Sequence, residues 1–178
     1  MDNRFRLYIS PMTCIGCLTC QTACQAYHHL PSNVFFRRVD RAVFDEKTGE
    51  RWFSGSCNHC EHPACIAVCP TGAMHKEEDG TVVHDDGKCI GCGRCLWNCP
   101  YGAISMNGIS GQAQKCDGCL QRRKDGLDPV CVEACPTKSI SIGASYPVRR
   151  LEGCSFPEFE MTEPSTMVRC EDEGEEND

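Results

Sequence analysis

Residues 89–100 read CIGCGRCLWNCP. Three cysteines fall within seven residues, a fourth follows at Cys99, and Pro100 comes next. A loop this tight places three thiolates on three corners of a small cage, while its backbone amides face the sulfur atoms. Gly91 suits such a loop because a Cβ atom would disfavour the positive φ angle that the turn needs. The stretch therefore predicts a 4Fe–4S site.

The fourth cysteine of this stretch indicates a second site. Cys99 lies too far along the following segment to close the same cage. The spacing Cys-x2-Cys-x2-Cys-x3-Cys-Pro is that of bacterial ferredoxins, in which the fourth cysteine ligates the neighbouring cluster. One motif of this kind therefore implies another.

The chain contains four such motifs. Motif one spans residues 14–24, and motif two spans 57–69 with a longer middle gap. Motif three is 89–99, and motif four spans 116–135 with an 11-residue excursion before its third cysteine. The sequence after the fourth cysteine also recurs, as PTGAM, PYGAI and PTKSI. We interpret this pattern as a fourfold internal repeat.

The ligand exchange of two-cluster ferredoxins predicts how the motifs pair. Motifs two and three are close in sequence and are joined by a predicted hairpin, so they form one unit. Motifs one and four then form the other. The predicted metal ligands are Cys14, Cys17, Cys20 and Cys135 (site one); Cys57, Cys60, Cys65 and Cys99 (site two); Cys89, Cys92, Cys95 and Cys69 (site three); and Cys116, Cys119, Cys131 and Cys24 (site four).

The predicted fold class is α+β, with two bacterial-ferredoxin-like two-cluster units, one inserted in the other. A short strand at residues 5–9 precedes motif one, and a helix follows it. Aromatic and β-branched residues on either side of a polar loop predict a hairpin. The predicted divisions are 1–33 with 107–143 for unit one, 34–54 for the hairpin, 55–106 for unit two, and 144–178 for an extended arm and acidic tail.

Cysteine usage sets the class of protein. The chain has 18 cysteines in 178 residues. Zinc sites do not require a third thiolate three residues after the second. A disulfide scaffold would not repeat one cysteine spacing with a glycine inside the loop and a proline after it. We therefore expect four 4Fe–4S clusters. Cys154 and Cys170 lie outside the motifs and are interpreted as free thiols or an incidental pair.

Charge and hydropathy exclude other classes. The formal charge of −7 becomes about −15 if each oxidised site adds about −2. Nucleic acid is therefore not an expected partner. No apolar stretch resembles a signal peptide or a membrane span, so we expect neither. The acidic residues 171–178 are interpreted as a solvated tail.

Other residues are assigned lesser roles. His59 and His62 are interpreted as loop surface. Trp97 and Tyr101 are expected to pack over a cluster and exclude water. Two basic patches could serve docking or simply be solvated: Lys115, Arg122, Arg123 and Lys124, and Arg37 with Arg38. No arrangement of catalytic residues appears, so the chain is not expected to be an enzyme by itself.

The motifs, their order and their gaps resemble a known family. Over about residues 5–143 the chain resembles the four-cluster electron-transfer subunit of the dimethyl sulfoxide reductase family of molybdenum enzymes. The resemblance is closest in CNHCEHPAC at 57–65, PTGAMHK at 70–76, CIGC at 89–92 and KCDGC at 115–119. In some relatives one ligand of motif three is replaced and a three-iron cluster is held, but here Cys92 is present.

The resemblance implies partner subunits and a cellular location. It implies a large molybdopterin catalytic subunit, and often a membrane partner that exchanges electrons with quinone. The unit of motifs one and four would lie nearer the molybdenum subunit. The complex would be membrane-associated through its partners, either cytoplasmic or exported with them. Two alternatives remain at this point: a stand-alone polyferredoxin shuttle, and a metal-storage or zinc-structural protein.

Two segments are expected to contact the catalytic partner. The hairpin carries Phe35, Phe36, Trp52 and Phe53, which a solitary shuttle would have no reason to expose. The arm from Tyr146 to Arg169 has little periodicity and is interpreted as a strap. Deletion of residues 146–178 is expected to release the chain from the partner and to leave the iron content nearly unchanged.

Overall fold

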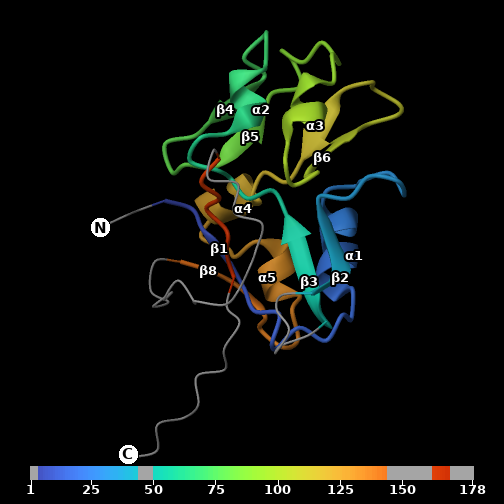
Figure 1. Cartoon of the computed structure of the whole chain (residues 1–178), viewed down its shortest axis with the longest axis vertical. Coiled ribbons are helices and arrows are strands. Elements are labelled where there is room, and N and C mark those ends of the chain that lie inside the picture. The colour runs from blue at the N-terminus through green and yellow to red at the C-terminus, as the bar shows by residue number, and fades with distance from the viewer. Residues whose placement is uncertain (1–3, 44–49, 144–161, 169–178) are drawn as a thin grey trace, which may run out of the picture.

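The computed structural model describes residues 4–43, 50–143 and 162–168. These residues form short helices and mostly antiparallel strand pairs, which agrees with the predicted α+β class (Figure 1). The helices are α1 (Thr19–Tyr27), α2 (Ala64–Ala67), α3 (Arg94–Asn98), α4 (Leu120–Lys124) and α5 (Val130–Glu133). The strands are β1 (Leu7–Ile9), β2 (Arg37–Val43), β3 (Glu50–Ser56), β4 (Met74–Lys76), β5 (Val82–His84), β6 (Ile104–Met106), β7 (Ala113–Lys115), β8 (Ile140–Ile142) and β9 (Met167–Val168).

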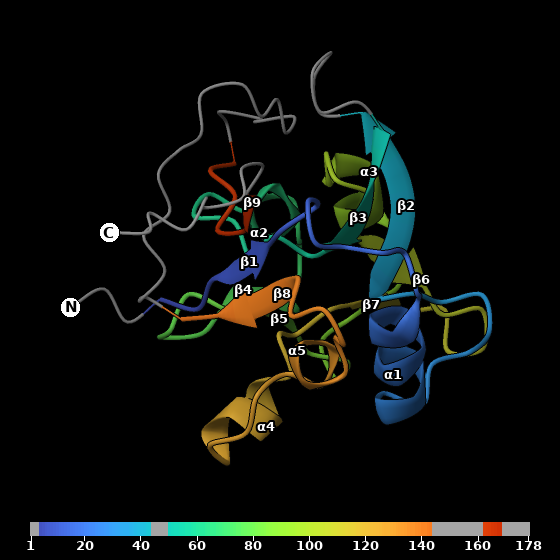
Figure 2. The same cartoon turned by 90° about the horizontal axis from the view of Figure 1, so that it is seen from below.

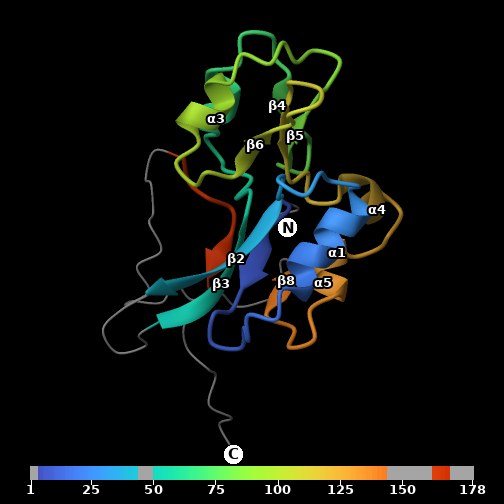
Figure 3. The ribbon, with the colours of Figure 1, turned by 90° about the vertical axis from the view of Figure 1, so that its right-hand side faces the viewer.

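Motifs one and four lie together although they are far apart in the sequence. Strand β1 pairs antiparallel with β8, with Leu7 opposite Ile142. Helix α1 of motif one packs on α5 of motif four, as Figure 3 shows. Their buried core combines apolar side chains with cysteines of both motifs: Phe5, Leu7, Val39, Val132 and Ile140 with Cys20, Cys131 and Cys135.

Motifs two and three occupy the opposite end of the molecule (Figure 1). Strands β4 and β5 form the predicted hairpin, with Met74 opposite His84. Helix α2 packs on α3, and β6 pairs with β7. Met74, Ile104 and Ala113 form the centre of this end, together with Cys95.

The β2–β3 hairpin confirms the expected pairing but not its expected exposure. Its register runs from Arg37 opposite Ser56 to Val43 opposite Glu50. Phe36 is only 9% exposed, and Trp52 packs on the core of motifs one and four. Phe35 and Phe53 are half-buried. The expected exposure is therefore wrong for Phe36 and Trp52, because both rings pack with cysteines of their own chain. Contact of this hairpin with a partner stays a prediction.

The described part of the C-terminal arm folds back on the chain. Strand β9 pairs in parallel with β1, on the side away from β8 (Figure 2). The amide of Glu61 donates to the carbonyl of Glu163, and the amide of Ser165 donates to the carbonyl of Asn58. Residues 162–168 therefore contact motif two of their own chain. The rest of the arm, with Cys154, Cys170 and the acidic tail, lies outside the described residues.

No helix within the described ranges has the length and apolar character needed to cross a bilayer. The longest of them, α1, has 9 residues.

Candidate metal centres

Each motif places a left-handed residue immediately before its second cysteine. Gly16, Gly91 and Gly118 have φ angles of 69°, 69° and 65°. In motif two the same position is His59, with a φ of 43°. Histidine is one of the few side chains that populate this region. The four loops therefore share a left-handed residue at this position, between the first and second cysteines of each motif.

Close packing explains why three of these positions are glycine. A Cβ atom on Gly16 would collide with the ring of Trp52. On Gly91 it would collide with the carbonyl oxygen of Gly111, and on Gly118 it would lie 2.6 Å from Phe5. Another part of the chain thus packs directly against each of these three loops.

Site two is a cavity with four cysteines in its wall. Cys57, Cys60, Cys65 and Cys99 line a space of about 360 Å³, part of which is open to solvent. Burial raises the pKa of Cys65 to about 12, and the neighbouring Cys57 thiol adds to the shift. The same two causes raise the pKa of Cys60 to about 11. The structure thus brings together the four cysteines predicted for this site, one of them from motif three.

Site one also combines residues from two motifs. Burial raises the pKa of Cys14, and its electrostatic interactions with Cys135 and Cys17 act in the same direction. The hydroxyl of Thr19 donates to the Cys17 sulfur at 3.3 Å. On the buried side, Ser54 Oγ lies 3.3 Å from Cys20 Sγ.

Site four is the most deeply buried of the four. Burial raises the pKa of Cys116 well above its usual value, and the next largest cause is the Cys24 thiol. Burial raises the pKa of Cys24 to about 12, and the Cys131 thiol is the largest electrostatic contributor to this shift. His28 Nε2 lies 3.6 Å from Cys119 Sγ. His28, Asp117 and Cys119 also form a compact trio of ligand atoms, but Cys119 belongs to site four.

Site three is the most exposed. Electrostatic interactions with Cys89 and Cys92 add to the burial that raises the pKa of Cys95. Cys69 and Cys89 pack on the apolar cluster that contains Cys95. Cys92 is exposed, and so is Ile90 beside it, at 67%.

The fourth cysteine of a motif is followed by a turn rich in donors. Cys69 and Cys135 each lie 3.7 Å from the hydroxyl of the threonine two residues later. Burial would raise the pKa of each thiol, but backbone amides and these hydroxyls lower it below its usual value. The repeated sequence Cys-Pro-Thr therefore stabilises a thiolate twice.

The four sites follow one another in a row. The thiol of Cys20 in site one interacts electrostatically with Cys131 in site four. Cys116 of site four and Cys57 of site two share an apolar cluster with Phe36. Cys65 and Cys99 of site two pack with Cys95 of site three. The order along the molecule is therefore one, four, two, three.

Family models match the chain twice. A model described as a 4Fe-4S dicluster domain matches residues 48–145, and a second model of the same description matches residues 6–70. Among curated proteins, the B subunit of anaerobic dimethyl sulfoxide reductase from Escherichia coli (strain K12) is 39% identical, over 95% of this chain and 90% of the relative. The chain belongs to the iron–sulfur subunits of the dimethyl sulfoxide reductase family of molybdopterin oxidoreductases.

Other relatives agree with this family. The corresponding subunit of anaerobic dimethyl sulfoxide reductase from Haemophilus influenzae is 37% identical, over 94% of this chain and 89% of its own length. The thiosulfate reductase electron transfer subunit PhsB of Salmonella typhi is 34% identical, over 80% of this chain and 77% of its own length. The resemblance found in the motifs is confirmed.

The donor set of this chain fits the cofactor of its family. All sixteen motif cysteines are free thiols. They are arranged around backbone amides and hydroxyls that favour thiolate sulfur, as cluster ligation requires. Two dicluster matches account for four 4Fe–4S clusters.

The interpretation of His59 as loop surface, made from the sequence, is wrong. It is 2% exposed, and its Nδ1 accepts a hydrogen bond from the amide of Val82 at 3.1 Å. Burial lowers its pKa well below the usual value, and the charges of Lys115 and Arg123 act in the same direction. Its place at the glycine position, visible when the four motifs are aligned, could have signalled this. His62 is exposed, as expected.

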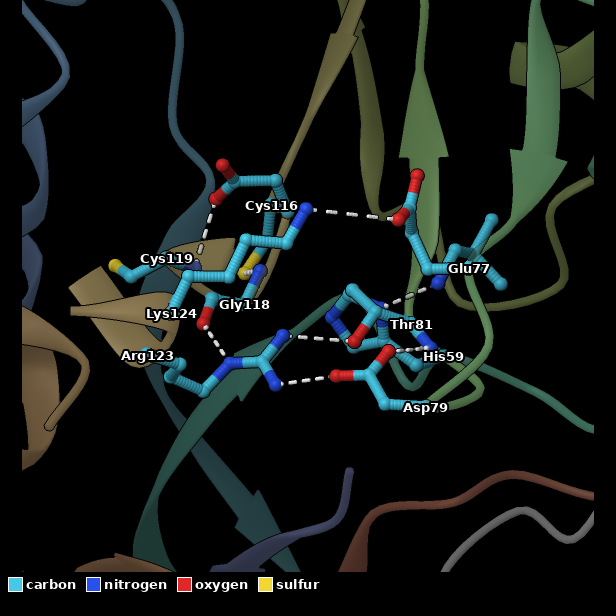
Figure 4. A network of polar contacts seen from close by, with 11 residues as sticks. His59, Glu77, Asp79, Thr81, Cys116, Gly118, Cys119, Arg123 and Lys124 are labelled. Carbon is cyan, nitrogen blue, oxygen red and sulfur yellow. Dashed lines mark hydrogen bonds and ion pairs between the residues drawn. The ribbon is translucent and has the colours of Figure 1, made fainter. Parts of the chain in front are cut away.

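The predicted basic patch around motif four is also wrong. Lys115 is 4% exposed and donates to the carbonyl oxygens of Val82 and Cys116. Arg123 binds Asp79 at 2.5 Å and Thr81 at 2.7 Å, with its guanidinium 3.9 Å from the centre of the Phe5 ring. Figure 4 shows this network, in which Lys124 also pairs with Glu77. Arg122 pairs with Glu133 at 2.7 Å. These cations join motif four to the β4–β5 hairpin and to α5.

The two aromatic residues near motif three have different surroundings. Tyr101 lines the cavity of site two, and its hydroxyl lies 2.9 Å from Thr162 Oγ1. Trp97 is 84% exposed. The expectation that Trp97 covers a cluster within this chain is wrong, because α3 turns this ring outward.

Proposed function

We propose that this chain is an electron-transfer subunit. It carries electrons through four 4Fe–4S clusters between a molybdopterin catalytic subunit and a quinone-linked membrane partner or another redox partner. It performs no substrate chemistry itself. The observation that carries the proposal is the continuous row of four cysteine groups across one small molecule.

The proposed ligand sets are those predicted from the motifs. Each site takes three thiolates from its own motif and one from the paired motif. The cavity wall of site two supports the exchange of Cys99, and the electrostatic interactions of Cys14 with Cys135 and of Cys24 with Cys131 support the exchange in unit one. Residues 55–106, with β7 packed on them, are then a two-cluster unit inserted between the two halves of unit one, 1–33 and 107–143.

The chain's own residues hold and shield the centres. When bound, each cluster supplies a one-electron carrier. Amides and hydroxyls around Cys17, Cys69 and Cys135 stabilise the thiolates that ligation needs. Burial at the centre of the row keeps water away from site four, where Cys24, Cys116, Cys119 and Cys131 are all buried.

Both ends of the row reach the surface. At site one, Cys17 is exposed beside Ile15 and Leu18, which are 60% and 44% exposed. At site three, Cys92 is exposed beside Ile90 and Trp97. Exposed apolar side chains at a reactive edge favour protein contacts. Two redox partners, one at each end, fit this arrangement, and association with a membrane would come through them.

Co-purification and two surface variants test this proposal. We expect the full-length chain, isolated without oxygen, to co-purify with a large molybdopterin protein. Ile15→Glu should slow electron exchange with one partner, and Trp97→Glu should slow exchange with the other. Leu127→Glu, at a residue that is 49% exposed in the loop between α4 and α5, is the matched control. A chain that carries its clusters but always elutes as a monomer would instead be a diffusing shuttle.

A further inference from the structure

Arg37 is a buried cation that has no acidic partner among the described residues. It is 2% exposed and belongs to the largest fully buried side chains. Its Nη1 donates to the carbonyl and the hydroxyl of Ser54 at 2.7 and 3.0 Å, and its Nη2 donates to Ser56 Oγ at 3.0 Å. No carboxylate in the described ranges forms an ion pair with it. A buried charge requires a compensating one nearby.

The surroundings of Arg37 point to that compensating charge. Burial alone would lower the pKa of the guanidinium, but Cys131, Cys116, Cys20 and Cys24 raise it by electrostatic interaction. These cysteines belong to sites one and four. Packing agrees with this, because Phe36 shares an apolar cluster with Cys24 and Cys116, and Val39 shares one with Cys20 and Cys131. The counter-charge of Arg37 is therefore the thiolate sulfur of these two sites.

Ser54 connects the guanidinium to one of these sulfurs. The hydroxyl of Ser54 accepts from Arg37 and is 3.3 Å from Cys20 Sγ. Since its oxygen already receives a hydrogen bond, its own proton is free to donate to the sulfur. Ser54 is 1% exposed, so no water competes for this contact.

We propose that Arg37 sets the reduction potentials of the clusters in sites one and four, and that Ser54 extends its effect specifically to site one through Cys20. This inference rests on the proposed ligand sets. Reduction adds one negative charge to a cluster, and a fixed buried cation stabilises that charge more than water-screened charges do. Hydrogen bonds to the ligating sulfurs act in the same direction. Arg37 is a positioning residue, since its hydrogen-bonded path to a ligand sulfur runs through Ser54 to Cys20, and it acts on site four by its charge alone.

The neighbouring residue provides a matched control. Arg38 follows Arg37 on β2 but is exposed, with its guanidinium 5.7 Å from the centre of the Phe35 ring. Arg38→Gln removes the same charge from the same strand. Solvent screens exposed charges, so this variant should leave the potentials nearly unchanged.

The test is a reductive titration of the full-length holoprotein, followed by electron paramagnetic resonance, with dithionite as the reductant. Arg37→Gln should make the clusters of sites one and four harder to reduce by at least tenfold, which is about 59 mV for one electron. The clusters of sites two and three should keep their potentials. Ser54→Ala should shift site one alone, and Arg37→Lys should shift sites one and four less than Arg37→Gln.

Iron and sulfide analysis of each variant separates the outcomes. Full cluster content with unchanged potentials in Arg37→Gln would overturn the proposal. If the Arg37→Gln variant loses clusters instead, the Ser54→Ala variant tests the proposal, because it keeps the buried Arg37 charge. In that variant a potential at site one equal to wild type would overturn the proposal. A wild-type chain without clusters would contradict the proposed function rather than this inference.

Discussion

At the scale of single residues, the position before the second cysteine decides how closely the chain packs on each cluster loop. Trp52, Gly111 and Phe5 approach the three glycine loops to distances that a Cβ atom would not allow. His59 fills the same position in motif two and meets Phe5 edge-on, with ring centres 5.1 Å apart. Glycine at this position thus allows a ring or a carbonyl oxygen to approach the loop closely, whereas in motif two the buried His59 ring takes that space.

Gly91→Ala should damage site three. An L residue at its φ of 69° costs roughly 1–2 kcal/mol, and the new Cβ would collide with the carbonyl of Gly111. We expect loss of one cluster of the four, measured as iron and sulfide per chain. Gly108→Ala is the control, because nothing lies within 4 Å of its added Cβ. Equal iron in both variants would contradict the packing argument.

Cluster assembly should depend on pH through the buried thiols. Burial raises the pKa of Cys24 and Cys65 to about 12, so the cluster-free fold favours their protonated forms. The stability that this gives is present below the usual thiol pKa and is lost as pH rises toward 12. Ligation must displace these protons, so assembly should be favoured by about tenfold per unit of pH for each proton released. Reconstitution with iron and sulfide between pH 7 and 9 measures this, and a yield that falls over this range would contradict it.

The burial of some single residues could not be predicted from the sequence. The spacing of the cysteines was sufficient to predict the four groups, because each loop is a local structure. His59, Lys115 and Arg37 are buried by distant segments: β5 faces the first two, and β3 faces Arg37. Nothing in their immediate neighbours along the chain reports those contacts, so they were interpreted as surface.

At the scale of elements, the segment 162–168 acts as a cover for motif two. The carbonyls of Thr162 and Glu163 accept from the amides of His62 and Glu61. Ser165 Oγ donates to the carbonyl of His59 at 2.9 Å. The hydroxyl of Thr162 lowers the pKa of Cys60, against the larger effect of burial. These contacts revise the expectation that removal of the arm would leave the iron content unchanged.

Truncation at two points tests this cover. A chain ending at residue 161 should lose the cluster of site two, or lose it faster in air, because the loop at residues 58–62 loses its hydrogen-bond partners. A chain ending at residue 168 keeps these contacts and should match the full chain. The measurement is iron content and the rate of bleaching in air. Identical rates for the two truncated chains would contradict the role of this segment.

The elements were partly predictable. The β2–β3 hairpin and the β4–β5 hairpin follow from alternating apolar residues around a polar turn, which is a local signal. Strand β9 has only two residues and pairs with β1 across almost the whole chain. No local sequence pattern marks such a strand, because these two residues form a strand only by pairing with β1.

At the scale of the whole molecule, four cysteine groups form a row with exposed apolar residues at both ends. The internal repeat was sufficient to predict four cysteine groups, and their division into two units of two sites stays a prediction. The repeat did not indicate that partly buried cations join motif four to the β4–β5 hairpin, as Arg123 does through Asp79 and Thr81. The row is the property on which the proposed electron transfer between two partners depends.

The most direct test of this function is a cluster count on the oxygen-free, full-length chain during a reductive titration. We predict about sixteen irons and sixteen sulfides per chain, with four cluster signals that appear in steps and interact magnetically with their neighbours in the row. Four zinc ions without sulfide, or clusters that show no interaction with one another, would contradict the row of four electron carriers.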